Sequence, residues 1–432
     1  MKYSIKLLTL LLVSVFTAVS CSDWVGETDD PIDEIVDDAL NNEEQVPFLE
    51  TGVLANFAQT HDNLSVTVDG LSDLLQFDPE GNSLATFPTY QELDQGDITF
   101  DNNSVDGVYA NLNETRFLAD DLIRRIDQIG NFEDAAVRDQ ALFTANWVGG
   151  ISRYWLGSYF GLVPTTKGAP IDNSDIIPRA ELYTQAIAKY DEALNYASAA
   201  QAKIVNSLKA ELYIAQNNYS AAADAIADGA LVSGDAPLQS LHSLESTNAW
   251  YNAAGPGRTQ LNVDPRFPDY ISDVPEEANR IEITGFDEDF SGQVITYYYV
   301  NYELDSPIDV VTWQEVALMK AEILLDNPAA DVGDPGATPL SLINAVRASH
   351  NIPDYVGTVD MDVIMEEREK ELFATGDRLL DQLRTGSFHL QGGSLYSVPS
   401  SPVTGNSYLI VANPWEHLPI TSRERNNNPN FN

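Results

Sequence analysis

Apolar side chains recur with the period of a helix face over long stretches of the chain. From Asp106 to Ile129 and from Ala135 to Phe160 this spacing predicts two long helices. The second helix is rich in aromatic residues, and aromatic residues at helical spacing usually belong to a core. We therefore expect Tyr154, Trp155 and Tyr159 to be buried.

Shorter helical segments follow in a repeating arrangement. Apolar positions predict helices over about 182–197, 204–215 and 219–226, and Pro178 suits a position at the start of the first. The segment Ala210–Ala222 resembles the tetratricopeptide pattern, with small residues where paired helices must approach closely. Such units cannot bury their apolar faces alone. We therefore predict a mainly α fold of stacked helix pairs.

Three more helices are predicted toward the C-terminus. The first begins at Thr312, whose spacing to Glu315 fits a capping box. The second covers Pro339–Ser349, and the third covers Asp360–Thr375. Gly376 is well placed to end the third helix in a left-handed conformation.

The pattern between Val53 and Tyr90 is mixed. The β-branched run Val66–Val68 favours a strand, while Gly70 and Pro88 are turn markers. We expect this part of the body to be irregular, with a short strand.

A long region without helical periodicity, about 231–305, concentrates aromatic residues among Gly, Pro, Asn and Asp. Long loops in a compact protein are usually functional. If Gln293–Tyr302 is a strand, Tyr297 and Tyr299 share one of its faces. Flat rings flanked by amides and carboxylates suit the apolar faces and polar rims of sugars. The candidate ligand-binding residues are Trp250, Tyr251, Asn252, Tyr297 and Tyr299, and packing of the loop onto the helices is the alternative role for these rings.

The N-terminus has the pattern of an exported lipoprotein. Lys2 and Lys6 precede an apolar run, Leu7–Val19, which fits a secretory signal and is too short for a membrane-spanning helix. Cys21, the only cysteine, comes directly after small residues. We interpret Cys21 as the lipidated first residue of the mature chain; a chance cysteine in an ordinary secreted protein is the alternative. The following acidic stretch, up to about residue 46, predicts an extended tether.

The charge balance excludes some partners. The chain has 66 acidic and 23 basic residues, a formal net charge of −43. Such a chain has no basic surface to release counterions from nucleic acid, so nucleic acid is excluded as a partner. Attachment to an anionic membrane by charge is excluded for the same reason. The acidity suggests a protein that stays soluble in concentrated salt, or simply an acidic surface protein.

No enzyme motif stands out. The five histidines are scattered, without metalloprotease spacing, and neither a nucleophile elbow nor a phosphate-binding loop occurs. The acidic run Asp287–Asp289 lacks the ligand spacing of a known calcium loop. We therefore predict no catalytic residues, no cofactor and no metal, although chance pairs of carboxylates leave a glycosidase open.

Four helical segments follow one another toward the C-terminus: Trp313–Glu322, Leu342–Arg347, Glu367–Arg378 and Asp381–Arg384. In this order they resemble the C-terminal signature of the SusD/RagB family of outer-membrane nutrient-binding lipoproteins. Arg153–Pro164 is similar to the end of the family's first helix pair. The tail, with His417–Ile420 followed by Asn428-Pro429, is similar to the family's usual ending.

The resemblance implies a function as well as a fold. It implies a SusD-like fold and a surface lipoprotein on the outer membrane that binds a nutrient, most often an oligosaccharide. It also implies delivery of that nutrient to a SusC-like TonB-dependent transporter, with no bond made or broken. A tetratricopeptide-like adhesion or assembly protein and a surface glycosidase remain the alternatives.

The domain organisation that we predict has three parts. Residues 1–20 are the signal peptide, and 21–46 are the lipidated cysteine and tether. Residues 47–432 are one SusD-like body, with helical repeats over about 106–230 and 306–386 and the ligand loops over about 231–305.

Overall fold

The computed structural model describes residues 37–79, 81–290, 292–387 and 415–431. The signal peptide, Cys21 and most of the acidic tether lie outside these ranges. The described part of the tether forms two short 3-10 turns, Asp37–Leu40 and Glu43–Gln45, before the body begins. None of the described helices is both long and apolar enough to cross a membrane.

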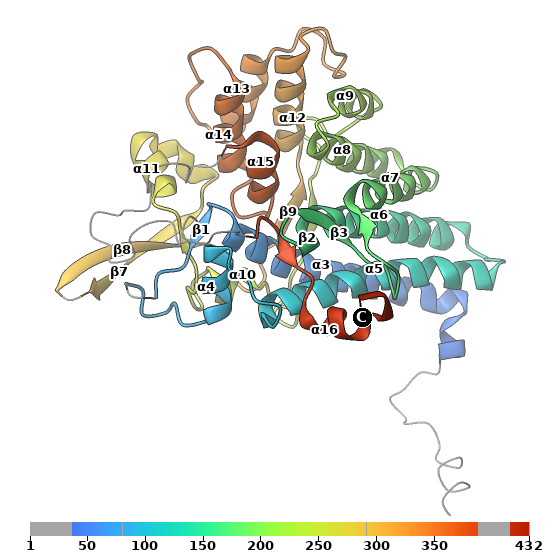
Figure 1. Ribbon diagram of the computed structural model, residues 1–432. Coiled ribbons are helices and arrows are strands. Elements are labelled where there is room, and N and C mark those ends of the chain that lie inside the picture. Colours follow the sequence, from blue (N-terminus) through green and yellow to red (C-terminus); the bar gives the residue numbers. More distant parts are fainter. Residues whose placement is uncertain (1–36, 80, 291, 388–414, 432) are drawn as a thin grey trace, which may run out of the picture.

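Three long helices form the base of the molecule (Figure 1). They are α3 (Val46–Leu71), α5 (Asn103–Ile129) and α6 (Ala135–Tyr159), and α3 packs against both of the others. The prediction of a strand at Val66–Val68 is wrong, because these residues lie in the second half of α3. That half is buried on every side, and Leu64, Val66 and Val68 alternate with the equally buried Ser65, Thr67 and Asp69, so no exposed stripe marks a helix.

The remaining helices continue the stack. Each of the following helices packs on its neighbours: α7 (Arg179–Leu194), α8 (Ala199–Ala215), α9 (Tyr219–Ala227), α12 (Trp313–Asp326), α13 (Pro339–Ser349) and α14 (Met361–Glu371). Glycines permit close approach: a Cβ on Gly150 of α6 would lie 2.6 Å from the Tyr190 ring of α7. The predicted fold of stacked helix pairs is confirmed, and Tyr154, Trp155 and Tyr159 are core residues as expected.

The C-terminal helices differ slightly from the prediction. Thr312 Oγ1 accepts a hydrogen bond from the Glu315 amide (3.0 Å), but the Glu315 side chain is buried beside Arg368, so only half of a capping box forms. The third helix ends at Glu371, before the expected Thr375. Gly376 does adopt a left-handed conformation, φ 97°, in the turn that leads to α15 (Arg378–Thr385).

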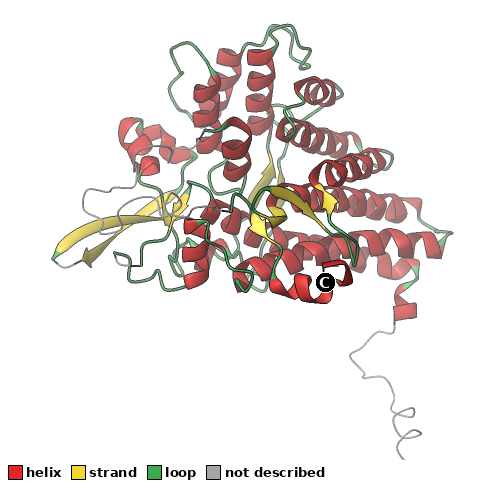
Figure 2. Cartoon of the chain, viewed as in Figure 1, coloured by secondary structure: helices red, strands yellow, loops and turns green. Residues whose placement is uncertain are grey.

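Strands are short except in one hairpin. The two strands of this hairpin, β7 (Ile283–Phe290) and β8 (Gln293–Val300), pair in an antiparallel register and project from the body (Figures 1 and 2). Small sheets tie distant segments together: β2 (Phe160–Val163), β3 (Thr166–Ala169), β4 (Ile177–Pro178) and β10 (Leu418–Pro419) in one, β5 (Leu238–Ser240) with β9 (Ile308–Val311), and β1 (Leu75–Gln76) with β6 (Asn262–Val263).

Short helices complete the body. They are α4 (Pro88–Gln95), α10 (Trp250–Ala253), α11 (Arg266–Asp273), the 3-10 turn η3 (Pro275–Asn279), α16 (Ser422–Asn427) and the final turn Pro429–Phe431. Three of these, α10, α11 and η3, lie in the region that the sequence indicated only as irregular.

Arginine side chains are directed inward, into ion pairs with buried carboxylates. Arg280 contacts Glu277 (2.7 Å) and Glu367 (2.7 Å), and Arg378 contacts Asp73 (2.7 Å). These pairs hold the family-like signature segments against the rest of the fold. They also remove positive charge from the surface, which is left strongly acidic.

This distribution of charge predicts that salt stabilises the protein. Repulsion among surface carboxylates opposes folding, and added ions screen it over about 10 Å at 0.1 M and about 3 Å at 1 M. We expect the melting temperature to rise by several degrees between low salt and about 1 M NaCl. Thermal unfolding followed by circular dichroism tests this, with KCl as the control that separates screening from a specific effect of sodium. A melting temperature that falls or stays constant with salt contradicts the prediction.

Candidate ligand-binding cleft

Trp250 lies in the core of the loop region. It is completely buried in the short helix α10, and its Nε1 donates to Ser65 Oγ of α3 (2.8 Å). Asn248 Oδ1 accepts from the Trp250 amide (2.9 Å) and so caps this turn. The indole has no ring face open to a ligand, which would reach it only after a rearrangement of the surrounding core.

Tyr251 and Asn252 follow on the surface. Tyr251 is half-buried, and its ring covers the turn at Gly257, where a Cβ would lie 2.1 Å from the ring. Asn252 is exposed. Ligand contact by these two residues stays a prediction.

The tyrosines of β8 lie as the strand register requires. Tyr297 and Tyr299 share a face, and each ring contacts Phe286 of β7. The Tyr297 hydroxyl donates to Asp78 Oδ2 (2.6 Å), and Tyr297 is buried, which gives it a role in fastening the hairpin to the body. Tyr299 is half-buried and stays a candidate for ligand contact.

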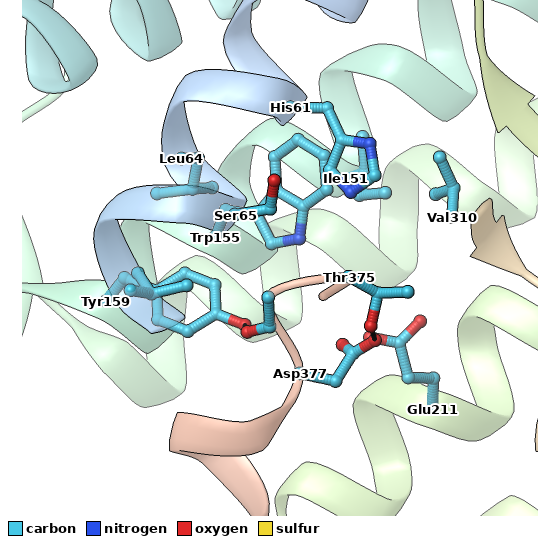
Figure 3. Close-up of a pocket in the computed structure, with 12 residues that line it drawn as sticks. His61, Leu64, Ser65, Ile151, Trp155, Tyr159, Glu211, Val310, Thr375 and Asp377 are labelled. Atoms are coloured by element: carbon cyan, nitrogen blue, oxygen red, sulfur yellow. Dashed lines mark hydrogen bonds between the residues drawn. The ribbon is translucent and has the colours of Figure 1, made fainter. Parts of the chain in front are cut away.

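The interior contains a small enclosed cavity that is unsuited to a ligand. His61 and Trp155 stack beside it (5.2 Å between ring centroids), and the carboxyl groups of Glu211 and Asp377 point into it (Figure 3). Its volume is about 10 Å³, barely enough for one water molecule. Burial lowers the pKa of His61 to about 3, so its imidazole is neutral at ordinary pH.

A larger hollow opens at the base of the hairpin, and we call it the cleft. It encloses about 460 Å³ between the ends of β8 and β9, the first residues of α12, η3 and the loop before β5. Trp313 and Tyr302 contribute aromatic surface to its lining. Trp313 is the first residue of α12 and is half-buried.

Amide side chains surround these rings. They come from four separate segments and are Gln239, Asn279, Asn301 and Gln314. Amides both donate and accept hydrogen bonds, so these side chains can pair with ligand hydroxyl groups, which also donate and accept. The cleft thus combines flat apolar surface with a polar rim.

Asp309 of β9 is a partly buried carboxylate of the cleft. Gln239 Nε2 donates to its Oδ1 (2.7 Å), and among the described residues no basic side chain forms an ion pair with it. Burial raises the pKa of Asp309 above its usual range. A partly desolvated carboxylate of this kind gains from hydrogen-bond donors on a ligand.

Three other titratable side chains of the cleft contact one another. Glu371 Oε1 lies 2.9 Å from His350 Nε2, and Glu371 Oε2 lies 3.4 Å from Arg280 Nη1. Arg280 is held mainly by Glu277 and Glu367, outside the cleft. No cluster of three or more His, Cys, Asp or Glu side chains suited to a metal occurs in the described part of the chain.

Sequence reasoning missed the residues of this cleft. Trp313 was noted only as the first residue of a family-like helical segment, while Asp309 lies in a short strand that no pattern marked. A tryptophan at the first turn of a helix, directly after an N-cap, was the one available signal.

Comparison with known proteins identifies the fold. No protein-family model and no curated protein matches the chain. Solved structures do match: a SusD superfamily protein from Bacteroides thetaiotaomicron is 16% identical, with a TM-score of 0.69, over 90% of this chain and 98% of that chain. A SusD superfamily protein from Bacteroides vulgatus is 17% identical, with a TM-score of 0.68 and the same coverage.

A third structure is that of a laminarin-binding SusD-like protein. It is 16% identical, with a TM-score of 0.61, over 88% of this chain and 96% of that chain. The chain therefore has the mainly α SusD-like fold, as the sequence resemblance implied.

Proposed function

We propose that this protein binds an oligosaccharide in the cleft and does not alter it chemically. The observation that carries the proposal is the composition of the cleft: Trp313 and Tyr302 rings, surrounding amides and the carboxylate of Asp309 enclose about 460 Å³. Sugar rings present an apolar C–H face and a hydroxyl rim, and this lining offers a surface complementary to each. The laminarin-binding relative of the same fold supports the proposal.

The cellular role follows from the sequence resemblance. Lipidation at Cys21 would attach the protein to the outer membrane, and the acidic tether would hold the body away from the lipid. The bound nutrient would then pass to a SusC-like TonB-dependent transporter. Residues 47–432 would act as one body in this process.

Titration calorimetry with a panel of neutral oligosaccharides, including laminarin fragments, tests the binding step. We expect micromolar affinity, weakened about 10-fold or more by Trp313→Ala, because loss of an aromatic anchor removes much of the contact surface. Asp309→Asn is expected to weaken binding without removing apolar packing. Product analysis of the same samples is expected to show the sugar intact.

Three further variants complete the design. Phe48→Ala, at a 72% exposed position on α3, is the control and is expected to bind as the wild type does. Tyr251→Ala and Tyr299→Ala test the residues that the sequence indicated. Absence of binding across the panel contradicts the proposal, and consumption of the sugar identifies an enzyme instead.

A further inference from the structure

A second hollow, which we call the groove, lies beside the cleft. It encloses about 660 Å³ between α11, η3 and the end of the β7–β8 hairpin that meets the body. Its walls are mainly apolar, with Ile271 from α11, Ile281, and Ile283 and Tyr298 from the two strands of the hairpin. Such a concentration of branched aliphatic residues is unusual on a chain with a net charge of −43.

One wall of the groove is held in a defined position. Gly285 lies directly opposite Tyr298 in the strand register. A Cβ at residue 285 would lie 3.1 Å from Cε1 of Tyr298, so the ring lies flat against the neighbouring strand. This packing fixes the tyrosine as a rigid apolar surface.

The groove and the cleft share two lining residues, Glu282 and Asn301. These two residues lie directly beyond the paired strands, where the backbone N–H of Asn301 donates to the backbone carbonyl of Glu282 (2.9 Å). Along the same segment, Asn279 and Arg280 line the cleft, and Ile281 lines the groove. The two hollows therefore adjoin. A polar rim separates the cleft, which is lined by aromatic rings and amides, from the groove, which is mainly aliphatic.

We infer that the groove is a subsite for an apolar substituent, an aryl or acyl group, on the oligosaccharide whose sugar part lies in the cleft. Apart from Tyr298, the large apolar residues of the groove are isoleucines, which offer no flat face for stacking on a sugar but bury an alkyl or aryl group well. The inference rests on the proposed function, because the shared rim makes the groove an extension of that site.

Titration calorimetry with matched ligands tests the subsite. The probes are disaccharides of glucose, galactose, mannose and N-acetylglucosamine, each as the free sugar and as its p-nitrophenyl glycoside. The aryl glycoside is expected to bind about 10-fold tighter than the free sugar, because a further apolar ring is buried. Ile271→Asp is expected to abolish this gain and leave the affinity for the free sugar unchanged.

The matched control is Val294→Asp, the same kind of change at a 63% exposed position of the hairpin that lines neither hollow. It is expected to keep the gain. Equal affinities for free and aryl sugars overturn the subsite and leave the proposed function standing. An equal loss for both ligands in Ile271→Asp also overturns it. Absence of binding by all the sugars overturns the subsite and the proposed function together.

Discussion

Replacement of Arg378 by alanine is expected to lower the free energy of unfolding by about 3–5 kcal/mol. The guanidinium donates from Nε to Asp73 Oδ1 (2.7 Å) and from Nη2 to Asp73 Oδ2 (2.8 Å). It also lies 3.4 Å from Glu369, and its side chain is 1% exposed. Removing the guanidinium leaves the buried carboxylates of Asp73 and Glu369 with less compensating positive charge. Loss of one partner of a buried ion pair is strongly destabilising.

The position of this pair explains the size of the effect. Asp73 follows α3 near the start of the body, whereas Arg378 begins α15, so the pair connects the two ends of the fold. Arg266 also contacts Asp73 (2.8 Å), but its contact with Glu369 is longer (3.5 Å). Arg266 therefore cannot replace the bidentate geometry of Arg378.

Urea unfolding followed by circular dichroism measures this loss. Arg378→Lys keeps the charge without the planar fork and is expected to give an intermediate loss. The control is Arg124→Ala, whose ion pair with Asp121 is 46% exposed on the arginine side. It is expected to cost less than about 1 kcal/mol. Similar losses for Arg378→Ala and Arg124→Ala contradict the prediction.

Replacement of Glu211 by glutamine is expected to stabilise the protein above neutral pH. Glu211 of α8 is buried next to Asp377 at the enclosed cavity (Figure 3). Burial raises the pKa of Glu211 well above its usual range, and the charges of Glu315 and Asp377 act in the same direction. The Tyr154 hydroxyl and Arg368 oppose this shift only in part.

The direction of the pH effect follows from proton binding. Between the unfolded pKa of 4.5 and the raised folded value, the folded protein holds a proton that the unfolded chain has released. Stability therefore falls as pH rises through this range, and Glu211→Gln removes that loss. We therefore expect the variant to be more stable than the wild type at pH 8 and about equally stable at pH 4.

Urea unfolding at a series of pH values measures the difference between the variant and the wild type. The control is Glu181→Gln at an exposed position of α7, which is expected to leave the profile unchanged. Burial also raises the pKa of Glu315 to about 8 and that of Asp377 to about 6, so part of the pH dependence remains in the variant. A variant that is less stable than the wild type at pH 8 contradicts the prediction.

The helical framework could be predicted from the sequence because most of its helices have one polar face. The α5 helix and the α13 helix, for example, expose part of their surface, so the period of apolar residues marks them. The N-cap at Thr312 acts within one turn and could also be predicted. The sequence offered the strand β8 only as a possibility, on which Tyr297 and Tyr299 would share one face, and the structure forms this strand at Gln293–Val300.

The second half of α3 shows where this reasoning stops. Its residues are buried among several helices, so no exposed stripe marks the helix, and Val66–Val68 has the β-branched composition of a strand. Tertiary packing overrides local preference there. Burial of Trp250 has a similar origin, because its hydrogen-bond partner, Ser65, lies 185 residues away.

The sequence by itself thus determined the stacked-helix fold and its SusD-like character, since helical period, caps and ordered motifs are local properties of the chain. Only the tertiary structure decided which side chains meet in the cleft. Asp309, Trp313, Asn279 and Gln239 come from separate segments, and their proximity depends on how β5, β9, η3 and α12 pack together. No local sequence pattern predicts that these side chains lie together, because their proximity depends on contacts between residues far apart in the chain.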